Sequence, residues 1–130
     1  MRILGMLKAD ASSEAGAPPS KDLIERMGVF IEEVTKAGVM LDSNGLHPSR
    51  KGKRVRLANG KITVIDGPFT ESKEIVVGYW VWEVGSFEEA VEWARRCPSD
   101  PNDTTTSWLE IRPCPSLEEF AEEAKLAEQA

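Results

Sequence analysis

The chain has 130 residues, the size of a single domain, and 41% of them are apolar, which is enough for a core of its own. A charged fraction of 29% is ordinary for a soluble protein, and no apolar run approaches the roughly 20 residues that a membrane-spanning helix needs. The formal net charge of -6 argues against direct binding to nucleic-acid phosphates, which favours a basic surface.

The first part of the chain predicts a strand, a helix and a second strand. Residues 2–8 place apolar side chains on both faces of an extended segment, as in a strand that is covered on both sides. The small, polar and proline-containing segment 10–19 predicts a loop. Apolar residues at helical spacing predict a helix over 20–37, and a short strand near 39–41 leads into a loop that contains His47.

The second part predicts a hairpin and a long strand, followed by a β-α-β return. Apolar and polar residues alternate over 53–66 around Asn59-Gly60, a strong two-residue turn signal. The run 75–84 is apolar on both faces, so both must be covered. Two helices each open with a capping box. The remaining elements are, in chain order, a helix from Ser86, a strand over 107–112 and a helix from Ser116.

This order of elements predicts an α+β fold of the ferredoxin-like kind. Two β-α-β halves follow one another, with the hairpin inserted between them and one further helix at the C-terminal end. Both core helices then cover the same face of the sheet, and the other face is left bare with several large apolar side chains. An exposed apolar face of that size usually marks an interface. We therefore predict a single domain that forms a homodimer through the bare sheet face.

The N-terminus and the cysteines favour a cytoplasmic protein. The apolar N-terminal stretch ends at Lys8 and Asp10, too soon for a secretory signal. Cys97 and Cys114 each precede a proline and are not spaced as metal ligands. We expect free thiols, no bound metal, no cofactor and no membrane partner.

The most distinctive stretch of the chain is 66–71, Asp-Gly-Pro-Phe-Thr-Glu. A turn explains it most simply, since Asp, Gly and Pro are common turn residues. A functional site is the alternative, because the hairpin carries Asp66 to a strand end, where a carboxylate can face a cleft. The single histidine, His47, is the residue type best suited to acid/base chemistry near neutral pH.

A pairing of His47 with Asp66 is chemically sensible. The carboxylate would orient the ring and raise its basicity, and the ring would move the proton. We do not expect the strand before His47 and the long strand after Asp66 to be neighbours in the sheet, but their loops can converge at one end. The sequence leaves the distance between the two residues open.

Four charged residues near the motif are candidate substrate contacts. Arg54 and Arg56 lie on the polar face of the hairpin, where they could hold an anion. Glu71 and Lys73 follow the motif closely, and a solvated link into the next strand is the alternative for them. No glycine-rich phosphate loop, nucleophile elbow or metal-ligand spacing accompanies these residues.

Asp66-Gly67-Pro68-Phe69 and its flanks resemble the YCII-related family, in its DGPF subgroup. The resemblance extends from Met6-Leu7-Lys8 through Gly45-Leu46-His47-Pro48 to Glu110-Ile111-Arg112-Pro113. It implies a ferredoxin-like fold that dimerises through the sheet face as a dimeric α/β barrel, with His47 and Asp66 as a catalytic pair. A related member acts as a dehydrochlorinase on a chlorinated hydroxyquinol. Some DGPF domains are fused to sigma factors, which suggests a role in transcription initiation.

Two functions follow as expectations. The first is a small metal-independent enzyme of the lyase or isomerase type that acts on a small polar or aromatic substrate. In it His47 is the acid or base, Asp66 orients it, and an anion contact comes from Arg54 or Lys73. The second is a non-catalytic dimeric module that binds a ligand or a partner, such as a sigma-factor-type regulator. The enzyme requires His47 to lie near Asp66 in a closed cleft. The module predicts an exposed His47 and a second surface suited to a partner.

Overall fold

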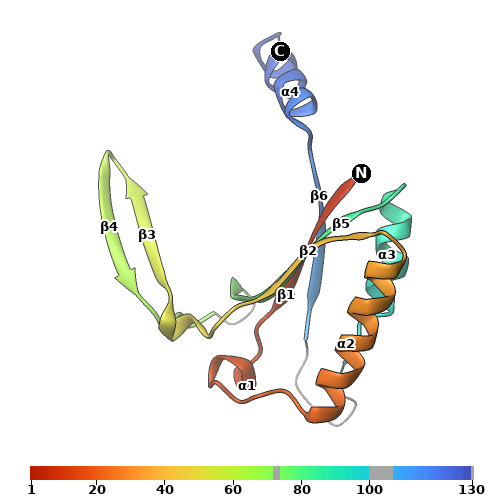
Figure 1. Ribbon diagram of the computed structural model, residues 1–130. Coiled ribbons are helices and arrows are strands. Elements are labelled where there is room, and N and C mark those ends of the chain that lie inside the picture. The colour runs from red at the N-terminus through yellow and green to blue at the C-terminus, as the bar shows by residue number, and fades with distance from the viewer. Residues whose placement is uncertain (72–73, 100–106, 130) are drawn as a thin grey trace.

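The computed structural model describes residues 1–71, 74–99 and 107–129 (Figure 1). The strands are β1 (Arg2–Lys8), β2 (Met40–Gly45), β3 (Lys53–Ala58), β4 (Lys61–Asp66), β5 (Val76–Glu83) and β6 (Leu109–Cys114). The helices are α1 (Ala11–Glu14), α2 (Lys21–Lys36), α3 (Phe87–Arg95) and α4 (Leu117–Gln129), with the 3-10 turn η1 (Ser49–Lys51) before the hairpin. The result is an α+β fold.

Four strands form an antiparallel sheet in the order β2-β5-β1-β6. This order is compatible with the ferredoxin-like fold that the sequence predicts. One expectation was wrong: β2 and β5 are direct neighbours, with Gly45 opposite Gly78. The hairpin β3–β4 forms a separate two-stranded sheet. The chain therefore leaves the four-stranded sheet after β2, forms the hairpin, and re-enters the sheet as β5 next to β2.

The core lies between the sheet and the helices α2 and α3, which cover the same face (Figure 1). Ile3, Trp80 and Trp82 face this layer from the sheet, and Phe30 and Val34 face it from α2. The rings of Phe30 and Trp80 meet edge to face, with their centroids 5.6 Å apart. The two tryptophans stack at 5.7 Å. Both tryptophans therefore belong to the core.

Local signals explain where α2 and α3 begin. The hydroxyl of Ser20 accepts a hydrogen bond from the backbone N–H of Leu23, and α2 starts at the next residue. At α3 the hydroxyl of Ser86 accepts from the N–H of Glu89, whose carboxylate accepts from the N–H of Gly85. The predicted helix starts are therefore confirmed. The segment 10–19 differs from the prediction, because it contains the short helix α1.

The second face of the sheet carries a smaller set of apolar side chains. Ile3 and Gly5 of β1 point to the helices, so Leu4 and Met6 point the other way. Leu4 lies opposite Val81, and Met6 lies opposite Tyr79. These four side chains, here called the bare face, are only half-buried.

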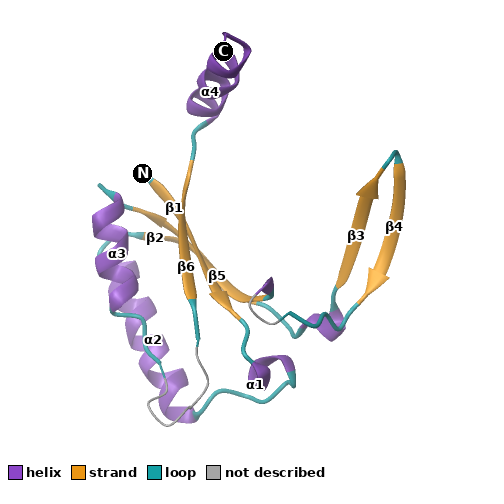
Figure 2. Cartoon of the chain, turned by 180° about the vertical axis from the view of Figure 1, so that it is seen from behind, coloured by secondary structure: helices purple, strands orange, loops and turns teal. Residues whose placement is uncertain are grey.

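The hairpin β3–β4 and the helix α4 stand apart from the sheet and its helices (Figures 1 and 2). The hairpin lies on the side of the sheet away from α2 and α3, and α4 continues beyond the end of β6. Strands β3 and β4 pair only with each other, and α4 has no buried residue among those described. We refer to these two elements as the arms.

Candidate functional site

The distinctive motif at Asp66 forms the base of the hairpin, packed tightly against η1. The N–H of Gly67 donates to the carbonyl of Gly52 at 3.1 Å. A Cβ atom on Gly67 would lie 1.9 Å from the carbonyl oxygen of Ser49, so only glycine fits here. The peptide bond between Gly67 and Pro68 is cis. The glycine of the motif is thus required by the close approach of two backbone segments.

Ser49 joins this base to the helix α1. Its N–H donates to Glu14 Oε1 at 2.8 Å, and its hydroxyl donates to Glu14 Oε2 at 2.5 Å. The same hydroxyl oxygen accepts from the N–H of Phe69 at 3.0 Å. Ser49 is buried, with 7% of its surface exposed. We call Glu14, Ser49, Gly67 and Phe69 the hairpin clasp.

Glu14 and Ser49 are not among the residues predicted from the sequence. A signal for α1 does exist, because Asp10 and Ser13 cap its first turn reciprocally. Ser13 N–H donates to Asp10 Oδ1 at 2.8 Å, and Asp10 N–H donates to Ser13 Oγ at 2.9 Å. This spacing of polar residues could have predicted the helix. Nothing local could have shown that Glu14 meets Ser49, which lies 35 residues later.

Asp66 is the last residue of β4, as predicted, and its carboxylate pairs with Lys53. The hairpin register places Lys53 directly opposite, and Lys53 Nζ lies 2.5 Å from Asp66 Oδ1. Both side chains are largely exposed, so the pair contributes little stability, at most about 1 kcal/mol. The chemistry that the structure shows for Asp66 is therefore an ion pair across the hairpin.

His47 lies on the exposed loop between β2 and η1. Within the part of the chain that the structure describes, its ring takes part in no hydrogen bond and no ion pair, and the structure does not bring it into contact with the Asp66 carboxylate. The acid/base pairing of these two residues therefore stays a prediction.

The other predicted site residues are spread along the hairpin and the following segment. The guanidinium of Arg54 lies over the ring of Phe69, 3.9 Å from its centroid, in a cation–π contact. Arg56 is exposed on the same face of the hairpin as Arg54. Glu71 is exposed, and its carbonyl accepts from the N–H of Glu74 at 3.0 Å. Lys73 lies outside the described residues.

A groove of about 880 Å3 runs between α2, the loop before it and the end of the sheet. Its apolar wall includes Leu7, Leu23, Ile24, Met27, Ile31, Leu46 and Val77. Its polar groups include Lys8, Asp10, Ser13, Ser20 and Ser99. We call it the α2 groove. Leu46 and Pro48, the neighbours of His47 in the sequence, line the α2 groove. None of the predicted site residues that the structure describes lines it.

The cysteines of the described residues form neither a disulfide nor part of a metal-ligand cluster. Cys97 and Cys114 are both free, and burial raises the pKa of the Cys97 thiol from its ordinary 9.0 to about 11. Across residues 1–71, 74–99 and 107–129, no three His, Cys, Asp or Glu side chains cluster as metal ligands. No helix in these ranges has the length and apolar character needed to span a membrane.

Comparison with known proteins places this architecture in a family. The model of the YCII-related domain matches residues 1–112. The chain belongs to the YCII-related family. This confirms the resemblance at family level. The matched region of the YCII-related domain ends within β6, so α4 lies beyond it.

One relative of this YCII-related protein is the uncharacterized protein R00369 of Rhizobium meliloti (strain 1021). The two are 37% identical over 68 residues, which cover 52% of this chain and 53% of the relative. The chain thus spans about half the length of the relative that it matches. The relative's name assigns it no activity, so function has to be argued from the geometry of the site.

Proposed function

We propose that this YCII-related protein is a dimeric ligand-binding module that holds a small apolar or aromatic molecule in the α2 groove. The groove carries the proposal. Its volume of about 880 Å3 lies in the range of small-molecule sites, and its wall is mainly apolar with a few polar groups. The exposed His47 and the exposed arms are the features that the module, rather than the enzyme, predicts.

Lys8 indicates which polar group such a ligand carries. Its side chain lines the groove and is only 15% exposed. Its nearest carboxylate partner among the described residues is Glu110, 3.9 Å away, which is beyond hydrogen-bond distance. A largely buried ammonium with donors to spare favours an anionic ligand group, and a carboxylate or phenolate beside an aromatic ring fits this surface.

Gly28 offers a direct test, because it lines the groove on α2 and a Cβ atom there would meet nothing within 4 Å. Gly28→Phe adds a ring that fills the groove, and Gly28→Ala is the matched control. We expect at least one of benzoate, salicylate and phenylacetate to raise the Tm of the wild type and of Gly28→Ala but not of Gly28→Phe. At a hundredfold excess over Kd, binding stabilises the fold by about 2.7 kcal/mol.

The ligand proposal fails if none of these acids shifts the Tm of the wild type. It also fails if the shift survives in Gly28→Phe, since the acid would then bind elsewhere. Benzyl alcohol has the same ring without the anionic group, and a smaller shift with it is expected if Lys8 contributes to binding.

A second candidate is the acid/base enzyme of the lyase or isomerase type, with His47 as acid or base and Asp66 as its orienter. The observation that favours it is that Leu46 and Pro48, on either side of His47, line the α2 groove. If the pair forms, Asp66→Asn changes the NMR resonances of the His47 ring nitrogens, because the carboxylate that orients the ring is lost. Unchanged ring resonances in Asp66→Asn count against the pair.

The dimer is part of the proposal, with the bare face as its centre. Leu4, Met6, Tyr79 and Val81 form a continuous half-buried apolar surface that a second copy would cover, as in a dimeric α/β barrel. A mass near the 14.4 kDa of one chain in light scattering would contradict it.

We further assign the chain to the DGPF subgroup, on the motif at 66–69, and expect it in the cytoplasm. A sigma-factor-type regulator remains our proposal for a protein partner.

A further inference from the structure

The two arms expose apolar surface that a folded chain normally covers. On the hairpin, Val55 lies opposite Val64 and Leu57 lies opposite Ile62, so all four side chains share one face. All are exposed, and Leu57 is 77% exposed. Exposed apolar clusters of this kind mark surfaces that meet a partner.

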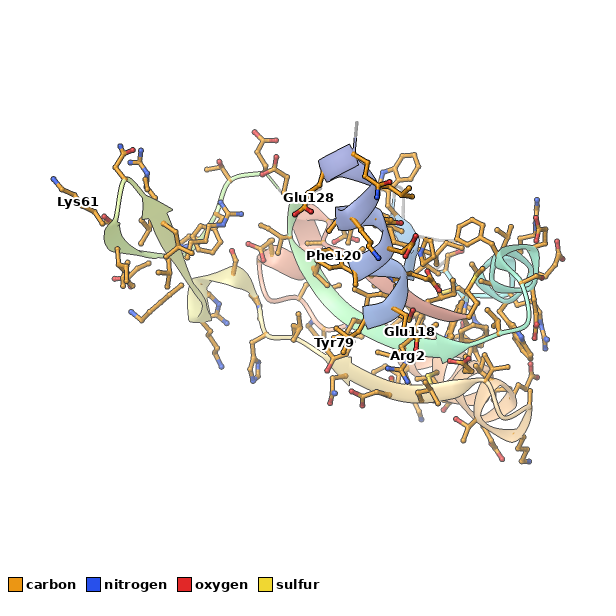
Figure 3. The ribbon with its side chains drawn as sticks, turned by 90° about the horizontal axis from the view of Figure 1, so that it is seen from above. Arg2, Lys61, Tyr79, Glu118, Phe120 and Glu128 are labelled. Carbon is orange, nitrogen blue, oxygen red and sulfur yellow. The ribbon has the colours of Figure 1, made fainter. Side chains whose placement is uncertain are left out.

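The helix α4 has a matching apolar stripe. Leu117, Phe120, Ala121 and Ala124 recur at helical spacing and share one side of the helix. Leu117 is 89% exposed and Phe120 is 63% exposed. Figure 3 shows Phe120 on α4 far from Lys61, which marks the tip of the hairpin. Neither arm therefore covers the other within one chain.

The arms also carry opposite charge. The hairpin over 53–66 has four cations and one carboxylate, a net charge of +3. Helix α4 has five glutamates and one lysine, a net charge of -4. Opposite net charges attract the two surfaces and specify which of them meet, although the attraction weakens with salt.

The sheet topology keeps the two arms of one chain apart. The hairpin follows the end of the edge strand β2, at Gly45. Because Gly45 pairs with Gly78 and Gly78 pairs with Leu7, this corner lies at the end of the sheet where β1 ends. Helix α4 follows the end of the other edge strand, β6, where Cys114 pairs with Arg2 at the start of β1. The arms thus leave the sheet at diagonally opposite corners, the hairpin on the side away from α2 and α3 and the helix α4 beyond the end of β6 (Figure 1).

A second copy stacked on the bare face brings the arms together. Four strands about 4.8 Å apart and about six residues long make a nearly square sheet, and two such sheets can pack with their strands crossed at about 90°. A two-fold axis can lie between the two sheets, along the diagonal that joins the two corners without an arm. Rotation about this axis places the hairpin corner of one copy over the α4 corner of the other copy. Each hairpin comes to stand beside the helix α4 of the other copy.

We propose that the helix α4 of one copy packs its apolar stripe on the apolar face of the hairpin β3–β4 of a second copy, and reciprocally. This contact rests on the homodimer of the proposed function and defines where the hairpin and the helix α4 of each copy lie in it. It covers Leu57 and Ile62 of the hairpin with Phe120 of the partner's helix. The hairpin lies within the part of the chain that matches the YCII-related domain, and α4 lies beyond it.

Photo-crosslinking tests the contact in the full-length protein. Benzoylphenylalanine replaces Phe120 in one preparation, which is mixed with 15N-labelled wild-type chain so that crosslinks between copies can be recognised by mass. We expect crosslinks to residues 53–66 of the labelled copy. The matched control carries the probe at Glu122, on the other side of α4, and should crosslink several-fold less. Crosslinks within one chain, to another part of the second copy, or at equal yield from both positions would overturn the contact.

A substitution in the hairpin provides an independent measurement. Leu57→Glu buries a charge at the proposed contact, so the Kd of the dimer should rise about tenfold or more. Val29→Glu, on an exposed position of α2, is the control and should leave the Kd unchanged. A dimer that tolerates both substitutions equally overturns the arm contact while the sheet-face dimer stands. A wild-type chain that is monomeric in light scattering overturns both, and neither result depends on ligand binding in the α2 groove.

Discussion

The sharpest structural prediction concerns Gly67, at the hairpin clasp. In Gly67→Ala the new Cβ atom would lie 1.9 Å from the carbonyl oxygen and 2.7 Å from the carbonyl carbon of Ser49. Both neighbours are backbone atoms, so no side-chain rotation relieves the contact. The two segments must separate by about 1.5 Å to reach an ordinary contact distance of 3.4 Å.

That separation removes two hydrogen bonds at the base of the hairpin. They are the bond from Gly67 N–H to Gly52 at 3.1 Å and the bond from Phe69 N–H to the Ser49 hydroxyl at 3.0 Å. Each contributes about 1 kcal/mol, and the overpacking itself costs about 1–3 kcal/mol. We therefore expect Gly67→Ala to lower the free energy of unfolding by about 3–5 kcal/mol, equivalent to a fall in Tm of about 10–15 °C.

Thermal melting and amide hydrogen exchange measure the two parts of this prediction. Exchange of the Phe69 amide should accelerate together with the fall in Tm, because its acceptor moves away. The control is Gly28→Ala, which meets nothing within 4 Å inside α2 and should be neutral or stabilising by up to about 1 kcal/mol. If Gly67→Ala melts like Gly28→Ala with the Phe69 amide unchanged, the close approach at the clasp is not a constraint on the fold.

Two further predictions concern a buried hydroxyl, that of Ser49, and a half-buried thiol, that of Cys97. Ser49→Ala removes the hydroxyl between Glu14 and Phe69 and should destabilise the fold by about 2 kcal/mol in urea titration, whereas Ser99→Ala, at an exposed position, should change it by less than about 0.5 kcal/mol. Equal effects would show that the hydroxyl does not stabilise the clasp. Because burial raises the pKa of Cys97 from 9.0 to about 11, the fold favours the protonated thiol. Iodoacetamide at pH 8 should therefore modify Cys97 slowly in the folded chain and rapidly in urea. The protonated thiol also contributes to the free energy of unfolding, and this contribution should be present below pH 9.0 and fade as the pH rises toward about 11. Equal rates in folded and unfolded chain would refute it.

Patterns between near neighbours in sequence determined most of the secondary structure. Asn59-Gly60 and the alternation around it defined the hairpin at 53–66, and β3 and β4 occupy those residues. The capping residues Ser20 and Ser86 marked where α2 and α3 begin. These signals are reliable because turn geometry, capping and side-chain period depend on residues only a few positions apart.

The tertiary structure alone decided which distant residues meet. Asp66 pairs with Lys53 because the hairpin register sets them opposite each other, and Glu14 at the end of α1 accepts two hydrogen bonds from Ser49 of η1. The need for glycine at position 67 follows from the approach of Ser49, eighteen residues earlier, which no local pattern reveals. A site is built from contacts between segments far apart in the chain. The sequence therefore identified the family and its motif, whereas the clasp, the α2 groove and the two arms emerged only when those segments were placed in space.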